Sequence, residues 1–189
     1  APDQALLGWR GAPTREGSLF SPSLDAVVED APCELSLITF HDETTGSPVA
    51  LAGPGPHSPV AARRAVDFAT VEGTAPTLLN VQRPGSDEGD AVTRGEAMVA
   101  DVAERAGLDP GAYDVEVVVN EDVEAAILDT VNHYETVCVG LSEQSETSRL
   151  MFGTIAERIS QEATSNVGII RRSDDETASP DSSVSRPVF

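Results

Sequence analysis

The residues best suited to chemistry form a glycine-containing pattern between residues 140 and 154. Gly140 ends an apolar run that is typical of a buried strand, and Gly153 and Thr154 open a stretch with the pattern of a helix. Glycines let backbone N–H groups approach phosphate oxygens closely, and a helix N-terminus adds unpaired donors and a favourable dipole. The pattern therefore predicts a phosphate-binding loop, in which Thr154 offers a hydroxyl and an N–H group.

Several polar residues of these turns also have a purely structural interpretation. Thr154-Ile-Ala-Glu157 matches a capping box, which the sequence favours because a cap explains both polar residues without a ligand. Arg149 can pair with a phosphate or with Glu146, and the ion pair is the simpler interpretation. His57 and Ser58 can contact a ligand or form a turn with a helix N-cap, and the turn is favoured.

Short apolar runs alternate with helical patterns from residue 48 to residue 171. We expect strands at 48–52, 77–81, 113–119, 136–140 and 167–171, and helices at 58–68, 91–106, 123–131 and 154–161. This alternation predicts a parallel sheet covered on both faces, because crossover helices bury each strand twice. The expected fold class is α/β, a flavodoxin-like doubly wound five-stranded parallel sheet. Ligands of such sheets bind at the switch point, here the turns after Ala52 and Gly140.

The chain also repeats part of itself without a gap. Ala5–Phe40 aligns with Val137–Arg172 at a constant offset (137 − 5 = 132), with glycine, phenylalanine, alanine and isoleucine shared at four positions. The earlier copy contains a helical stretch that Ser21 would cap, with Pro22 at its first position. A period of one domain length indicates tandem domains. We therefore expect an extra strand–helix–strand piece from a preceding repeat.

The expected organisation has four parts, in chain order: residues 1–41 as the C-terminal part of a first domain, 42–47 as a linker, 48–172 as a complete domain and 173–189 as a disordered acidic tail. The chain begins mid-domain, which suggests a piece of a longer protein.

The amino-acid composition limits the classes of partner that the chain can bind. The chain has a formal net charge of −20, and all 12 basic residues are arginine. Phosphates would repel such a surface, so nucleic acid and anionic membranes are excluded as partners. A dispersed acidic surface without lysine is typical of proteins that work in molar salt, where the screening length is about 3 Å. Cys33 and Cys138 lie in or beside apolar runs and fit a reducing, cytoplasmic compartment. No stretch is long and apolar enough for membrane insertion.

The run from Pro48 to Arg172 resembles a universal stress protein domain, and Ala5–Phe40 resembles the last third of another. The family's ATP-binding pattern is glycine, two residues, glycine, nine residues, then glycine followed by Ser or Thr. Its counterparts here are Gly140, Glu143 and Gly153-Thr154 in the complete domain. The resemblance implies ATP or AMP, with Mg, as the ligand. The binding residues carried into this chain are Gly53, Gly55, Val81, Gly140, Ser142, Arg149, Gly153 and Thr154.

Both copies depart from the family's pattern. Glu143 places a carboxylate where the second glycine stands, and Gly53 stands where ATP-binding members carry an aspartate that contacts the nucleotide. In the partial copy Ser21 replaces the last glycine, and Pro22 removes a helix N-terminal N–H donor. A like-charge contact near 4 Å costs roughly 4 kcal/mol at an effective dielectric constant near 20. We therefore expect the nucleotide site to be degenerate.

The leading hypothesis is a regulatory or dimerisation module without enzymatic activity. A working ATP- or AMP-binding stress sensor is the alternative, and a nucleotide hydrolase is a third. No nucleophile elbow is present, and His41 and His133 lack a second metal ligand at useful spacing. The resemblance implies pairing through the last strand, either in a homodimer or with a tandem partner. Leu35–Phe40 would then lie antiparallel beside Val167–Arg171.

A narrower resemblance concerns the context of the chain. The LLGWRG run, the VVEDAPCEL run and the tandem arrangement resemble the cytoplasmic C-terminal modules of archaeal amino-acid permeases. This implies an archaeal, salt-adapted protein and the membrane domain of a transporter as a partner.

Overall fold

A computed structural model of the chain describes residues 4–10, 20–85, 88–141 and 154–173. The strands are β1 (Gln4–Gly8), β2 (Glu34–Thr39), β3 (Pro48–Leu51), β4 (Thr77–Gln82), β5 (Asp114–Val119), β6 (Thr136–Gly140) and β7 (Asn166–Arg171). The described helices are α1 (Pro22–Asp30), α2 (Ser58–Glu72), α3 (Glu88–Ala106), α4 (Val123–Val131) and α6 (Thr154–Glu162).

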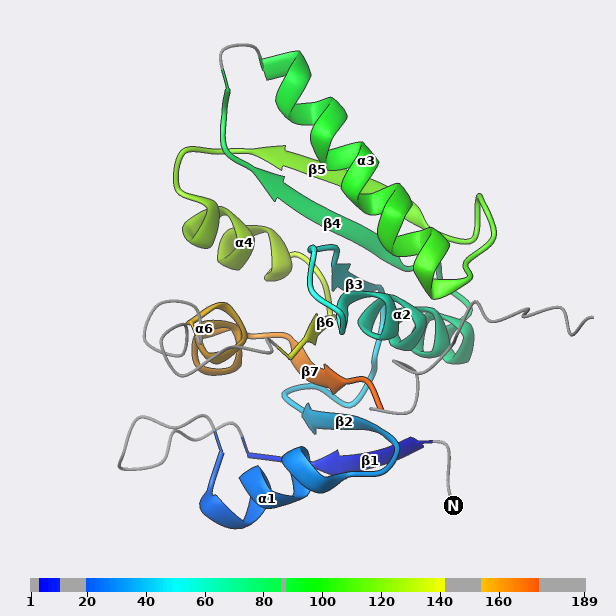
Figure 1. Cartoon of the computed structure of the whole chain (residues 1–189), viewed down its shortest axis with the longest axis vertical. Coiled ribbons are helices and arrows are strands. Elements are labelled where there is room, and N and C mark those ends of the chain that lie inside the picture. The colour runs from blue at the N-terminus through cyan, green and yellow to red at the C-terminus, as the bar shows by residue number, and fades with distance from the viewer. Residues whose placement is uncertain (1–3, 11–19, 86–87, 142–153, 174–189) are drawn as a thin grey trace, which may run out of the picture.

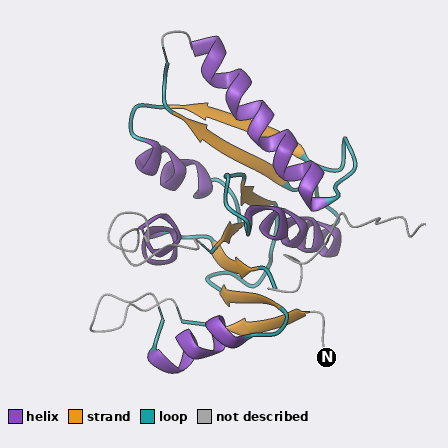
Figure 2. Cartoon of the chain, in the orientation of Figure 1, coloured by secondary structure: helices purple, strands orange, loops and turns teal. Residues whose placement is uncertain are grey.

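All seven described strands form one sheet in the order β1-β2-β7-β6-β3-β4-β5 (Figure 1). The five strands from β7 to β5 are mutually parallel, which confirms the doubly wound arrangement expected from the alternating patterns. Helices α2 and α3 cover one face, and α4 and α6 cover the other (Figure 2). The chain order reverses between β3 and β6, so their carboxyl ends form the switch point.

The strand–helix–strand piece at the N-terminus extends this same sheet. β1 pairs in parallel with β2, and β2 pairs antiparallel with β7, from Leu35 opposite Arg171 to Thr39 opposite Val167. The expected antiparallel neighbour of the last strand is therefore confirmed. The edge that β7 would otherwise present is covered within the chain, which removes a surface prone to association.

The sequence repeat is reproduced in the structure. β1, α1 and β2 begin and end at residues offset by 132 (136 − 4 = 132) from those that bound β6, α6 and β7. The two strand pairs have equivalent registers, Gln4 opposite Glu34 and Thr136 opposite Asn166. In the β2–β7 ladder Leu37 lies opposite Ile169, which is its own counterpart in the repeat. A local twofold axis therefore passes through this pair.

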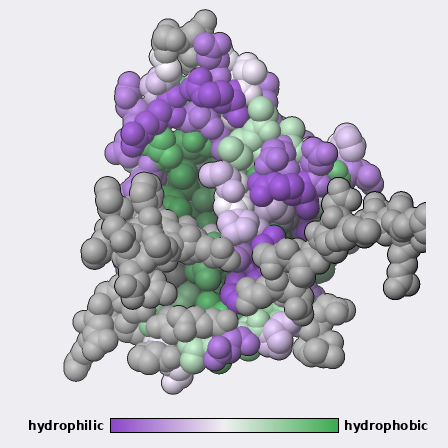
Figure 3. Space-filling view, viewed as in Figure 1, coloured by the Kyte–Doolittle hydropathy of each residue, from purple (hydrophilic) through white to green (hydrophobic). Residues whose placement is uncertain are grey.

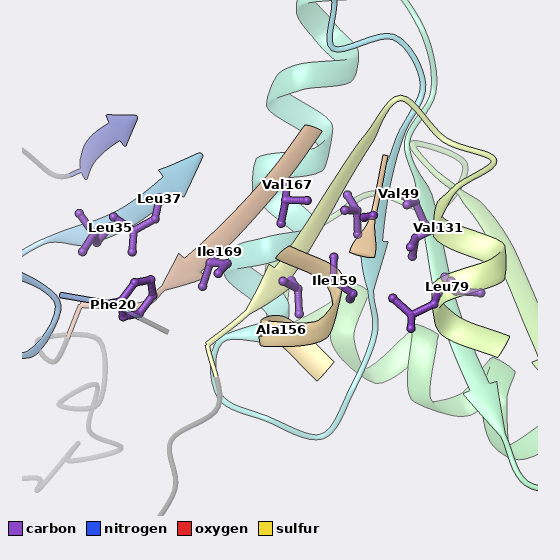
Figure 4. Close-up of a cluster of buried hydrophobic side chains, with 14 of the residues drawn as sticks. Phe20, Leu35, Leu37, Val49, Leu79, Val131, Ala156, Ile159, Val167 and Ile169 are labelled. Atoms are coloured by element: carbon purple, nitrogen blue, oxygen red, sulfur yellow. The ribbon is translucent and has the colours of Figure 1, made fainter. Parts of the chain in front are cut away.

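Two apolar clusters hold the sheet between its helices. The first runs without interruption from Phe20, Leu35 and Leu37 to Ile169 and Ile159 (Figure 4). The second packs α2 and α3 on the other face, and it contains one face of α2, namely Ala61, Ala65 and Phe68. Because the first cluster crosses from β2 to β7, burial of apolar surface joins the N-terminal piece to the rest of the molecule.

Of the two helix N-caps expected from the sequence, one is confirmed and one is wrong. The Ser21 hydroxyl accepts a hydrogen bond from Leu24 N at 3.4 Å, and Pro22 occupies the first turn, as expected for α1. The expected N-cap at Ser58 is wrong, because His57 is the N-cap of α2 and makes no side-chain cap. The Ser58 hydroxyl instead accepts a hydrogen bond from Gly53 N at 3.3 Å. The turn before α2 competes with the helix for this hydroxyl.

The segment 42–47 between β2 and β3 is tied to the sheet by hydrogen bonds. The Asn166 amide oxygen accepts from His41 N at 2.8 Å and Asp42 N at 2.9 Å, and its NH₂ group donates to Thr44 O at 2.7 Å. Thr136 Oγ1 donates to Thr45 O at 2.8 Å. Asn166 is fully buried, so these bonds satisfy the polar atoms of its side-chain amide, which water cannot reach.

We expect Asn166→Ala to lower the free energy of unfolding by about 3 kcal/mol, because it leaves three backbone groups of the linker without their partner. Asn132→Ala is the matched control, since the side chain of the exposed Asn132 accepts from Thr164 N and Oγ1 in the described part of the chain. It should cost about 1 kcal/mol. Urea unfolding followed by circular dichroism measures both values. Equal losses in the two variants would contradict the role of Asn166.

Candidate functional site

The turn after β3 forms one wall of the predicted site. Ala52 N donates to Leu79 O at 2.8 Å, and the chain then passes through Gly53 and Gly55 into α2. A Cβ atom placed on Gly53 would lie 3.6 Å from Ser58 Oγ, which is an ordinary contact. The backbone at Gly53 therefore has room for a Cβ atom, so packing alone does not require glycine there.

The end of β6 forms the opposite wall, and here glycine is required. A Cβ atom on Gly140 would lie 2.8 Å from the His57 carbonyl carbon and 3.0 Å from His57 Cβ. His57 is buried, and its Nδ1 accepts a hydrogen bond from Arg172 N at 2.9 Å. Gly140 thus lets the start of α2 pack directly against the end of β6, and this packing explains the residue without a phosphate.

The end of β4 supplies the remaining described surface. Val81 is half-buried and packs against the first apolar cluster, as do Leu51 and Val118. Asn80 is buried and donates from Nδ2 to Ala52 O at 2.7 Å, and Gln82 Nε2 donates to Asn80 Oδ1 at 2.7 Å. Sequence reasoning missed Asn80 and Gln82. The available signal was a pair of polar amides at the carboxyl end of an apolar strand.

The structure brings four predicted site residues to the carboxyl edge of the sheet, namely Gly53, Gly55, Val81 and Gly140. Ser142, Arg149 and Gly153 lie outside the described residues, as do Glu143 and Glu146. Thr154 is the first residue of α6, and its side chain is not among the described ones. The capping and phosphate-binding interpretations of Thr154 both stay predictions.

Neither a metal cluster nor a membrane span is found in the described part of the chain. No group of three or more His, Cys, Asp or Glu residues could hold a metal ion within residues 4–10, 20–85, 88–141 and 154–173. In the same ranges, every helix is too short or too polar to cross a bilayer. Trp9, in the N-terminal piece, packs edge-to-face on Phe20 with ring centroids 5.3 Å apart.

Comparison with known proteins places this architecture in a family. The model of the universal stress protein family matches residues 49–171. The chain belongs to this family. No curated protein sequence matches it.

Solved structures share the fold at low sequence identity. A universal stress protein from Archaeoglobus fulgidus is 19% identical, with a TM-score of 0.58, over 92% of this chain and 62% of that one. UspA from Lactobacillus plantarum is 12% identical, with a TM-score of 0.53, over 69% of this chain and 100% of that one. A universal stress protein in complex with cAMP is 17% identical, with a TM-score of 0.50, over 67% of this chain and 97% of that one. The chain spans less than two thirds of the Archaeoglobus structure.

We expect Gly140→Ala to lower the free energy of unfolding by about 1–3 kcal/mol, because the new methyl group collides with the backbone of His57. Gly8→Ala is the matched control at the equivalent position of the repeat, where nothing lies within 4 Å of an added Cβ atom. Urea unfolding without nucleotide measures both losses. An unchanged stability of Gly140→Ala would contradict the packing explanation and favour a ligand role.

Burial raises the pKa of the Cys138 thiol on β6 to about 12, with Arg64 opposing and Asp67 adding to the shift. We therefore expect the native thiol to stay protonated and react with iodoacetamide at about pH 9 at least about 100-fold more slowly than in the unfolded chain. The experiment uses the Cys33→Ala variant, so that Cys138 is the single thiol. Labelling of the native protein as fast as in urea would contradict this environment.

Proposed function

We propose that this chain is a regulatory module of the universal stress protein class, in which two domain units are joined through the β2–β7 ladder and the nucleotide site is weakened. The observation that carries the proposal is the antiparallel ladder with its local twofold axis at Leu37 and Ile169. The module has no enzymatic role. It holds two domain units in one fixed arrangement, which a partner protein or a ligand recognises.

Burial of equivalent positions supports residues 1–41 as the C-terminal part of a first domain. Leu6 is 53% exposed, whereas its counterpart Cys138 is 0% exposed. Val27 is 45% exposed, whereas its counterpart Ile159 is 0% exposed. The counterpart strand β6 pairs with β3 on its second side, and β1 has no such neighbour among the described strands. A β3-like strand of a first domain would cover this surface.

The turn after β3 supports a weakened nucleotide site. The resemblance to ATP-binding members calls for an aspartate at position 53, and this chain has glycine there although a Cβ atom would meet only an ordinary contact. Glu143 would add a carboxylate near the phosphates. Gly140, the one described glycine of the phosphate pattern in the complete domain, is accounted for by its contact with His57.

The second candidate function is an ATP- or AMP-type nucleotide sensor. It is favoured by the structural neighbour that was solved in complex with cAMP. The carboxyl edge also combines apolar Leu51 and Val81 with the amides of Asn80 and Gln82, a mixture suited to a nucleobase. Magnesium would then accompany ATP, and EDTA would abolish the binding of ATP but not of AMP.

The wider context is also part of the proposal. The module would act at the cytoplasmic face of the membrane as part of an archaeal transporter that works in high salt. Alternatively, it would form a homodimer through a surface other than the β7 edge. A gene whose upstream sequence encodes several apolar spans of about 20 residues would support the transporter. Release of ADP in excess over protein would contradict the absence of enzymatic activity.

We expect no shift of the thermal unfolding midpoint of the wild type in molar KCl on addition of millimolar Mg-ATP, AMP or cAMP. A ligand at 100 times its dissociation constant adds about 2.7 kcal/mol, which is a shift of several degrees. Gly53→Asp should gain such a shift, because it restores the carboxylate. Gly55→Asp is the matched control, with the same charge in the same turn. A shift in the wild type would contradict the weakened site and establish the sensor.

A further inference from the structure

One arginine of α2 is buried against the N-terminal piece. The Arg64 side chain is 7% exposed. Its guanidinium group forms an ion pair with Glu34 and donates a hydrogen bond to Gln4. A second carboxylate, Asp67 Oδ2, lies 2.7 Å from Nη1 and is largely exposed. Two of the partners of Arg64 therefore come from residues 1–41, the largely buried Glu34 and the exposed Gln4.

Two partners of Arg64 lie at the starts of the two strands of the N-terminal piece. Gln4 begins β1 and Glu34 begins β2, and these two residues lie opposite each other in the ladder. The Glu34 side chain is 16% exposed, and Arg63 Nη2 lies 3.8 Å from its other oxygen. The pair thus reaches from α2 across β7 to β2. A buried pair is screened by salt much less than a surface pair, so it persists in molar KCl.

The local twofold axis shows which residues would face Arg64 if β7 paired with a strand other than β2. The counterparts of Glu34 and Gln4 in the repeat are Asn166 and Thr136. If the β7 strand of a second copy replaced β2 in the same register, Arg64 would face these two residues. Neither carries a charge. Both are also engaged with the linker, since Asn166 donates to Thr44 O and Thr136 donates to Thr45 O.

We infer that the Glu34–Arg64 pair is the specificity determinant of the β7 edge, selecting β2 of the N-terminal piece over the β7 strand of a second copy. Breaking a buried ion pair by removing one partner is strongly destabilising, because the other charge remains uncompensated. A β7–β7 pairing would remove the largely buried partner Glu34 on both copies and leave Arg64 with only the largely exposed Asp67 of the carboxylates described beside it. The inference goes beyond the proposed function and does not depend on nucleotide binding.

The test compares Glu34→Gln with Glu43→Gln, which removes the same charge from the exposed linker. Hydrogen exchange followed by mass spectrometry reads the amides of the β2–β7 ladder. We expect exchange at least about tenfold faster in β2 for Glu34→Gln, with β4 and β5 unchanged and Glu43→Gln like the wild type. Identical exchange in the two variants would overturn the inference.

Glu34→Arg tests the selection itself, because it places a third positive charge beside Arg63 and Arg64 and should expel β2. Light scattering over a range of concentrations should then show a mass twice that of the wild type, as the exposed β7 edges pair. Glu43→Arg is the control and should keep the wild-type mass. Fast exchange in β2 without a change of mass would show that Glu34 anchors β2 but does not exclude a second copy, and would overturn the selection.

Discussion

The antiparallel pairing of β2 on β7 is the constraint on which the rest of the molecule depends. β7 ends a parallel sheet, and without a neighbour its backbone groups and the apolar faces of Val167 and Ile169 would be open to association. β2 satisfies that edge and brings Leu35 and Leu37 into the same apolar cluster (Figure 4). The linker hydrogen bonds and the Arg64 ion pair then hold β2 in one register.

The ladder is physically connected to the candidate site. Arg172 directly follows β7, and its N–H group donates to Nδ1 of the buried His57. His57 in turn packs against Gly140 at the end of β6. The space-filling view also shows an apolar surface at the position of α4 (Figure 3). A change in the pairing of β7 would therefore reach the turn before α2 through the Arg172–His57 hydrogen bond, and the end of β6 through the contact of His57 with Gly140. Such a connection supports the regulatory module proposed above.

Local patterns in the sequence predicted the alternating elements and the cap at Ser21, because each depends on periodicity or on the residues at a helix end. The antiparallel neighbour of the last strand was implied by the family resemblance, and the repeat supplied the strand. Local patterns did not predict that the Ser58 hydroxyl turns back to Gly53, since a turn and a helix compete for it. They also missed Arg64 and Asn166. These residues find partners 30 or more positions away, and no local spacing encodes such contacts.

The most direct measurement is the set of cross-strand nuclear Overhauser effects between β2 and β7 in the isotope-labelled chain. The account predicts antiparallel contacts centred on Leu37 and Ile169, with Thr39 near Val167 and Leu35 near Arg171. Such contacts must be intramolecular, and mixing labelled with unlabelled chain leaves them unchanged. A shifted register, or contacts that appear only between different copies, would contradict the intrachain ladder and the module built on it.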